Sequence, residues 1–184
     1  MPLARLFDFQ SGTIIQSGQV DSEFNQLVNY LKGGGGQSAH NVAIVGNVGA
    51  GQDDLHSHSI PANTLAVDGD SLDFVGGGTI LAAGSTKEVG FHVGGTPVFL
   101  TGAYDPSADA GWSTRVTVIR IDSDSIIATT QYADSVNQVA KGDTIQVNGL
   151  NFAAPIIMKW TGQDTDGVNN RVTQTMSVVR KFTV

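Results

Sequence analysis

Alternating apolar and polar residues dominate the chain from residue 61 to residue 184. In "WSTRVTVIRID", Val116 and Val118 would face one side of a strand while Arg115 and Thr117 face the other. Roughly eight runs of this kind follow one another at spacings of about 8–15 residues, with glycine-rich turns between them. The pattern predicts a mainly β fold, built as an antiparallel sandwich or barrel.

Turn residues and tryptophans add detail to this β region. Asp68 and Gly69 interrupt the alternation of "TLAVDGDSLDFVGG", and an Asp-Gly pair favours the positive φ angles of a tight hairpin. "GQDTDGVNN" separates the last two runs and predicts another hairpin tip. Trp112 and Trp160 each lie in a strand pattern, so we expect both indole rings to pack in the core.

A helix is predicted ahead of the β region, because four apolar residues recur at spacings of four, three and four: Val20, Phe24, Leu27 and Leu31. The Ser17 hydroxyl can cap its first turn, and the glycines at 33–36 end it because they lose too much backbone entropy in a helix. A helix of about four turns is marginal alone in water. Its apolar side therefore requires a partner, either the β region of the same chain or other copies in a larger assembly.

Two further segments complete the organisation of the chain. Ahead of the helix, "LFDFQSGTII" predicts an extended arm whose apolar side chains have no core nearby: Leu6, Phe7, Phe9, Ile14 and Ile15. Between helix and β region, glycines punctuate short apolar runs such as "VAIV", which predicts a linker or slender neck. We therefore expect a docking arm and helix at 1–32, a glycine-rich neck at 33–60 and a β head domain at 61–184.

Composition narrows the classes of function. The chain of 184 residues has 23 glycines, 15% charged residues and a formal net charge of −7, with no cluster of Lys and Arg. Nucleic-acid binding is not expected, since it requires cations to replace the counterions of the phosphates. There is no cysteine. No apolar signal segment and no apolar run of about 18 residues occurs, so we expect a soluble product without membrane insertion.

The arm, the helix and the β region resemble parts of tailed-bacteriophage appendage proteins. "FDFQSGTIIQSGQVDSEFNQLVNYL" is similar to the arm and helix with which many of these proteins dock onto the virion. "PANTLAVDGDSLDFVGGGTI", "STKEVGFHVGG" and the pattern W-x-x-x-V-x-V-I-R resemble the TNF-like jelly-roll head of phage fibres and capsid spikes. The resemblance implies a homotrimeric structural protein of the virion, assembled in the cytoplasm of the bacterial host.

The resemblance is compatible with two locations of the protein on the virion, the tail and the capsid. A tail fibre would bind tail proteins and present its head to a host surface glycan or receptor, whereas a capsid decoration spike would bind the major capsid protein. In both cases, trimerisation or docking would cover the apolar residues of the arm and helix. We expect these contacts to involve Phe7, Phe9, Ile14, Ile15, Val20, Phe24, Leu27 and Leu31.

The paired histidines in "LHSHSI" are the candidate metal ligands. On a strand, His56 and His58 point to the same face. Three chains around an axis would supply six imidazoles, a nitrogen shell that suits iron or nickel. Phage fibres of similar architecture carry His-x-His sites on their axis, so the resemblance implies an axial transition metal ion such as iron. The alternative is a polar strand whose histidines are solvated or hydrogen-bonded.

A second candidate site is the loop in "YDPSADAGW". We expect Tyr104, Asp105 and Asp109 to be exposed there and able to contact a ligand. Asp164 and Asp166 do not have the spacing of a calcium-binding EF-hand loop. Nucleophile elbows and Walker phosphate loops do not occur, so an enzyme is not expected. The rival to a virion protein is a carbohydrate-binding or cytokine-like binding module.

Overall fold

Alternation of buried and exposed side chains shapes the long strands. Along β7 (Ala110–Arg120) and β8 (Ile126–Asp134), nearly every second residue is buried. Because side chains alternate across a strand, this pattern turns one apolar face of the sheet toward a second sheet. The computed structural model describes residues 38–136 and 141–182.

Eleven strands occur in these residues. They are β1 (Ser38–Asn41), β2 (Val45–Gly46), β3 (Asp53–Ile60), β4 (Ser71–Ile80), β5 (Lys87–Val93), β6 (Thr96–Leu100), β7, β8, β9 (Lys141–Val147), β10 (Ile156–Asp164) and β11 (Val172–Phe182). Within this part of the chain, no helix is long and apolar enough to cross a membrane.

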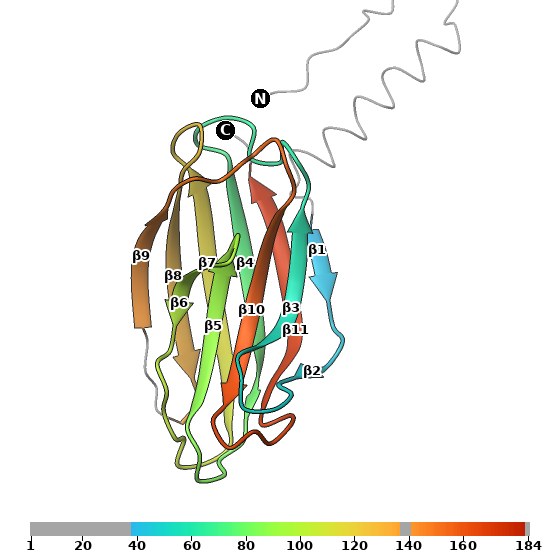
Figure 1. Cartoon of the computed structure of the whole chain (residues 1–184), viewed down its shortest axis with the longest axis vertical. Helices are drawn as coiled ribbons and strands as arrows, with labels where there is room; N and C mark the ends of the chain where they lie inside the picture. Colours follow the sequence, from blue (N-terminus) through green and yellow to red (C-terminus); the bar gives the residue numbers. More distant parts are fainter. Residues whose placement is uncertain (1–37, 137–140, 183–184) are drawn as a thin grey trace, which may run out of the picture.

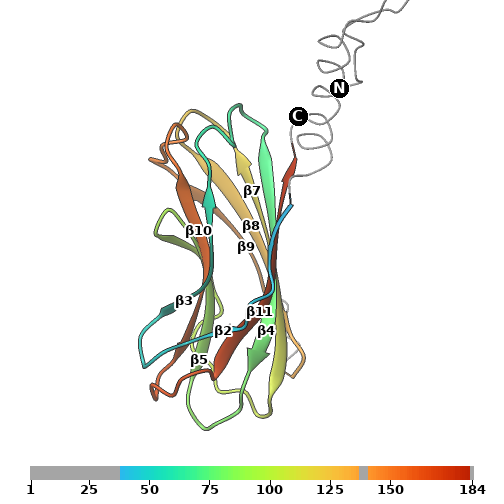
Figure 2. The same ribbon diagram turned by 90° about the vertical axis from the view of Figure 1, so that its right-hand side faces the viewer.

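The strands form two antiparallel sheets that face each other as a sandwich (Figures 1 and 2). The large sheet has the order β1-β11-β4-β7-β8-β9, with β2 also paired to β11. The small sheet has the order β3-β10-β5-β6. The chain passes repeatedly from one sheet to the other, as in a jelly roll. The prediction of a mainly β, antiparallel, jelly-roll-like sandwich is confirmed.

Aromatic residues fill the centre of the sandwich. The Trp160 ring centroid lies 4.9 Å from that of Phe91 and 6.1 Å from that of Phe74. The Trp160 indole N–H donates to the Thr114 hydroxyl over 2.7 Å, so its one polar atom is satisfied. Trp112 is also buried. The prediction that both tryptophans pack in the core is confirmed.

The predicted neck differs from the structure between residues 38 and 60. There, β1 and β2 pair with β11, and β3 pairs with β10 from Asp53 to Ile60. The head domain therefore begins well before residue 61. The glycines form bends between short strands, and a register shift within the β3–β10 pair interrupts the simple alternation. The arm and helix predicted at 1–32 lie outside the described residues.

The two predicted hairpin tips are turns that join strands of different sheets. Gly69 and Gly167 adopt φ angles of 94° and 71°, so both turns use the left-handed backbone expected of glycine. However, the first lies between β3 and β4 and the second between β10 and β11. The prediction of hairpins is therefore wrong at both places, because local alternation does not specify the strand with which a segment pairs.

The two ends of the sandwich differ in what they carry. Ser38 pairs with Arg180, and Phe182 pairs with Ser71, so the described chain starts and finishes at one end, which we call the base. The loops after β4, β6 and β10 lie at the opposite end, which we call the loop end (Figure 1). These loops span residues 81–86, 101–109 and 165–171.

Close approach of the sheets at Gly76 yields a stability prediction. A Cβ atom at this position would lie 2.6 Å from Trp160 Cε2 and 2.8 Å from the Gln174 side-chain nitrogen. We expect Gly76→Ala to lower the free energy of unfolding by about 1–3 kcal/mol, because the core must shift to admit the methyl group. Urea denaturation measures this effect. Gly142→Ala is the control, since its added Cβ would lie 3.5 Å from the Thr130 carbonyl oxygen, an ordinary van der Waals contact. Equal losses for the two variants would contradict the prediction.

Candidate functional site

Both histidines of "LHSHSI" point into the space between the sheets. His56 is 1% exposed, with Nδ1 2.9 Å from Ser177 Oγ and Nε2 2.8 Å from the Ala43 carbonyl oxygen. His58 Nε2 lies 2.9 Å from the same hydroxyl. The structure thus brings the two predicted ligands together, and it adds Ser177 from β11 of the other sheet.

The hydrogen bonds define the protonation of this group when both rings are neutral. A carbonyl oxygen only accepts, so His56 Nε2 carries the proton that goes to Ala43. His56 Nδ1 then accepts the single Ser177 hydroxyl proton, and Ser177 Oγ accepts from His58 Nε2–H. The result is an ordered chain of donors from His58 through Ser177 and His56 to the backbone at Ala43. We call it the histidine relay.

The histidine relay has consequences for metal binding. Both His56 ring nitrogens have partners within the same subunit. An ion shared by three chains would require both imidazoles to turn out of this interior. Among residues 38–136 and 141–182, no group of three or more His, Cys, Asp or Glu side chains is placed to hold a metal ion. Within one chain both histidines are hydrogen-bonded, and an axial ion shared by three chains stays a prediction.

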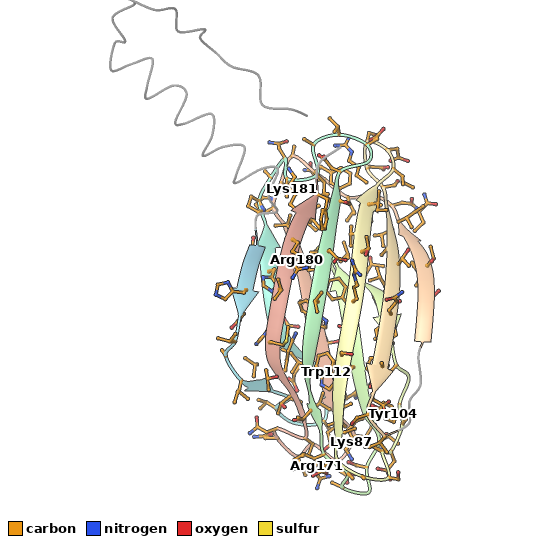
Figure 3. All side chains as sticks on the ribbon, turned by 180° about the vertical axis from the view of Figure 1, so that it is seen from behind. Lys87, Tyr104, Trp112, Arg171, Arg180 and Lys181 are labelled. Atoms are coloured by element: carbon orange, nitrogen blue, oxygen red, sulfur yellow. The ribbon has the colours of Figure 1, made fainter. Side chains whose placement is uncertain are left out.

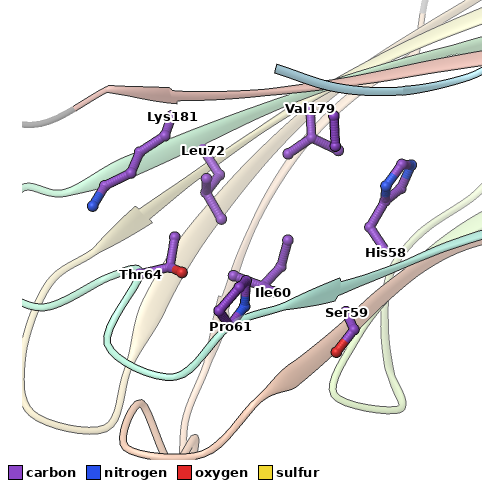
Figure 4. A pocket seen from close by; sticks show the side chains of 9 residues that line it. His58, Ser59, Ile60, Pro61, Thr64, Leu72, Val179 and Lys181 are labelled. Atoms are coloured by element: carbon purple, nitrogen blue, oxygen red, sulfur yellow. The ribbon is translucent and has the colours of Figure 1, made fainter. Parts of the chain in front are cut away.

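A cavity of about 380 Å³ lies between the sheets beside the histidine relay (Figure 4). Two walls line it, with Leu72, Val179 and Lys181 from the large sheet on one side and His58, Ile60 and Pro61 on the other. Ala39 also lines it, so the cavity lies where the described chain begins. Burial lowers the pKa of His58 below its usual 6.5, and the adjacent His56 lowers it further.

The predicted ligand-contact loop lies at the loop end. Tyr104 is half-buried, and its hydroxyl lies 2.7 Å from that of Tyr132. Asp105 is exposed and lies 3.7 Å from the Lys87 ammonium. The exposed Asp109 carboxylate accepts a hydrogen bond from the Ala82 amide over 2.8 Å. The three residues therefore occupy one loop, but each is tied to a different neighbour and they do not converge on one point.

A buried ionic cluster lies beneath this loop, and it was not predicted from the sequence. Lys87 and Asp164, a cross-strand pair on β5 and β10, are both fully buried. The Lys87 ammonium donates to the Ser85 carbonyl oxygen over 2.6 Å, and the Ser85 hydroxyl donates to Asp164. Arg171 lies 3.4 Å from the Asp164 carboxylate. Figure 3 shows Lys87, Tyr104 and Arg171 together at the loop end.

The charges of this cluster are balanced by contacts from three loops. Burial by itself raises the pKa of Asp164, but hydrogen bonds from Ser85 and the Asp166 amide, with the charges of Arg171 and Lys87, outweigh it and lower the pKa. The carboxylate is therefore ionised near neutral pH. Because Ser85, Asp105 and Arg171 come from different loops, the cluster fixes the loops relative to one another.

One sequence signal could have identified the cluster. In "KEVGFHV", Lys87 has the same parity as Val89 and Phe91, so a strand that buries the two apolar residues also turns the lysine inward. A buried lysine requires a carboxylate or several acceptors nearby. Its partner could not be read from the chain, since Asp164 is distant in sequence.

Comparison with known proteins gives similarities of overall arrangement. No protein-family model matches the chain, and no curated protein sequence does. A protein of unknown function from Shewanella oneidensis MR-1 is 8% identical, with 94% of this chain and 96% of that chain covered and a TM-score of 0.43. The CBM2 module of the evolved Dit of Lactobacillus casei BL23 phage J-1 is 9% identical, with coverage of 79% and 96% and a TM-score of 0.36. A legume lectin-like domain from Entamoeba histolytica is 9% identical, with coverage of 88% and 93% and a TM-score of 0.28.

The buried cluster predicts a large effect of Lys87→Met. This variant keeps most of the apolar stem but leaves the Asp164 carboxylate with fewer buried cationic partners. We expect the free energy of unfolding to fall by about 1–3 kcal/mol, because the buried Ser85 carbonyl oxygen loses its hydrogen bond from the ammonium and Asp164 loses a nearby positive charge. Urea denaturation at neutral pH measures the loss. Lys159→Met is the matched control, because its ion pair with Asp54 is partly exposed and should contribute less than about 1 kcal/mol.

The lowered pKa of His58 predicts a pH dependence of stability. Above pH 6.5 the imidazole is neutral in the folded and the unfolded chain, so the full stability is present. As the pH falls below 6.5, the unfolded chain takes up the proton first, and stability is lost until the pH passes the folded pKa. We expect His58→Gln to reduce the loss of stability between pH 7.5 and pH 5 in urea titrations. Equal losses for His58→Gln and the wild-type chain would contradict the prediction.

Proposed function

We propose that this chain is a structural protein of a tailed-bacteriophage virion that acts by display and binding rather than by catalysis. Three copies associate and dock through residues 1–32, and each projects its β-sandwich from the particle. The protein is assembled in the cytoplasm of the bacterial host and is carried on the virion. Two things support this proposal. One is the resemblance of the arm, helix and head to phage appendage proteins, and the other is the end of the sandwich to which the predicted arm is attached.

The observation that carries the proposal is the separation of the base from the loop end. The segment that contains the docking arm joins the sandwich at Ser38, at the base. The loops held by Lys87 and Asp164 lie at the opposite end. A sandwich attached through its base therefore presents these loops outward, and the predicted contact residues Tyr104, Asp105 and Asp109 are among them.

Host-surface attachment from the tail is the role that this arrangement favours. Loops that are fixed before binding lose little conformational entropy when a ligand binds, which favours recognition of a glycan or receptor. The neighbouring polar and acidic side chains, with Asp105 and Asp109 exposed, can accept hydrogen bonds from sugar hydroxyls. A decoration spike on the capsid would be attached through the same end, but it would not need to bind a ligand at its loop end.

The proposal predicts the mass of the assembled protein and its location on the virion. Light scattering of the full chain should give three times the chain mass of 19.2 kDa. Immunogold labelling of virions of the phage that encodes it should mark the tail; label on the capsid would instead assign the decoration role. Deletion of residues 1–32 should leave a folded head with a cooperative thermal transition that no longer joins particles. A full chain that is monomeric and absent from virions would overturn the proposal.

A further inference from the structure

One edge of the large sheet is apolar and has unusually exposed side chains. It consists of β1, residues 42–44 and β2, and we call residues 38–46 the uncharged edge (Figure 1). Val42 and Ile44 are 73% and 75% exposed, the highest values among the large hydrophobic residues in the described part of the chain. Val48, just beyond the edge, is 66% exposed. Exposed apolar residues are normally scattered singly, so this concentration indicates a contact surface.

Other sheet edges carry the residues that normally prevent association. Free edges are protected by charged side chains or proline, which oppose pairing with another strand. On the opposite side of the sandwich, β9 has the exposed Asp143, and β6 contains Pro97. By contrast, residues 33–52 include no Asp, Glu, Lys or Arg. The uncharged edge thus lacks these protecting residues, although the chain as a whole has a net charge of −7.

Hydrogen bonds inside the subunit fix the backbone of the uncharged edge at Ala43. The histidine relay ends on the Ala43 carbonyl oxygen, which accepts from His56 Nε2. The Ala43 amide donates to the Asn41 side chain over 2.9 Å. The polar backbone groups of Ala43 are therefore satisfied inside the subunit, and the flanking Val42 and Ile44 are left to solvent. A surface with fixed geometry associates at a lower entropic cost than a mobile loop.

We infer that the uncharged edge is where a second copy of this chain packs, next to the threefold axis of the trimer. The inference rests on the proposed function, from which it takes the trimer. The predicted helix ends at residues 33–36, and residue 38 follows within a few residues. At about 3.5 Å per residue, this connection spans less than about 20 Å, so in the proposed trimer the edge would start close to the predicted helix. Three acidic subunits repel one another, and an apolar surface without charge can approach the axis at the lowest electrostatic cost.

Cysteine cross-linking tests this contact directly in the full chain. The protein has no cysteine, so Ile44→Cys introduces a single thiol. We expect a short bismaleimide to convert this variant into covalent dimers at concentrations at which the trimer forms. Ile157→Cys is the matched control, because Ile157 is 46% exposed on β10 of the small sheet, away from the uncharged edge. It should remain uncross-linked.

A charge substitution provides an independent measurement. Val42→Asp combined with Ile44→Asp places two carboxylates in the contact and should raise the concentration for half-dissociation of the trimer at least tenfold. Ile157→Asp should leave it unchanged. Both positions are exposed in the subunit, so the thermal transition of the dissociated chain should stay the same.

The outcomes separate this inference from the proposed function. If the wild-type chain is trimeric but neither Ile44→Cys nor the double Asp variant differs from its control, the contact is elsewhere and the inference is overturned, while the trimer stands. If the wild-type chain is monomeric, the proposed trimer and the inference both fail. If the thiol of a monomeric Ile44→Cys chain is protected from reagent, the chain's own N-terminal segment covers the edge, which also overturns the inference.

Discussion

The contact of Trp160 with Gly76 sets the separation and the register of the two sheets. The indole ring of β10 lies against a strand of the large sheet at a point where no side chain can intervene. Its hydrogen bond to Thr114 fixes the ring along the strand direction, and Phe74 and Phe91 pack around it. Apolar burial between sheets is not directional, so close contacts such as this one constrain how they align.

Two buried polar groups then fix the periphery of the sandwich. At one edge, the histidine relay links β3 to Ser177 of β11 and to the backbone at Ala43. At the loop end, Lys87 and Asp164 link strands of the small sheet to three loops. Buried polar groups are costly unless they are hydrogen-bonded, so each group strongly disfavours any other arrangement of the chain around it. Each therefore stabilises a surface in a defined shape.

These two surfaces fit the two tasks that the proposed virion protein would have. The uncharged edge begins at the base, at Ser38, and in the proposal it makes the contact between copies. The loop end is the most distant part of the sandwich from that point, and it is suited to recognition. His56 and His58 fix the backbone of this edge through their hydrogen bonds to Ser177 and, from His56, to Ala43.

The sequence by itself determined the β class, the burial of Trp112 and Trp160 and the positions of the turns at Gly69 and Gly167. These properties depend on residues close together in the chain, through the period of two along a strand and the φ angles available to glycine. The period also places His56 and His58 on one face, but it does not say whether that face is inside or outside. Only the tertiary structure decided that the histidines point inward and that residues 38–60 belong to the sandwich. It also decided that Lys87 meets Asp164, because strand pairing brings together residues whose separation along the chain has no local signature.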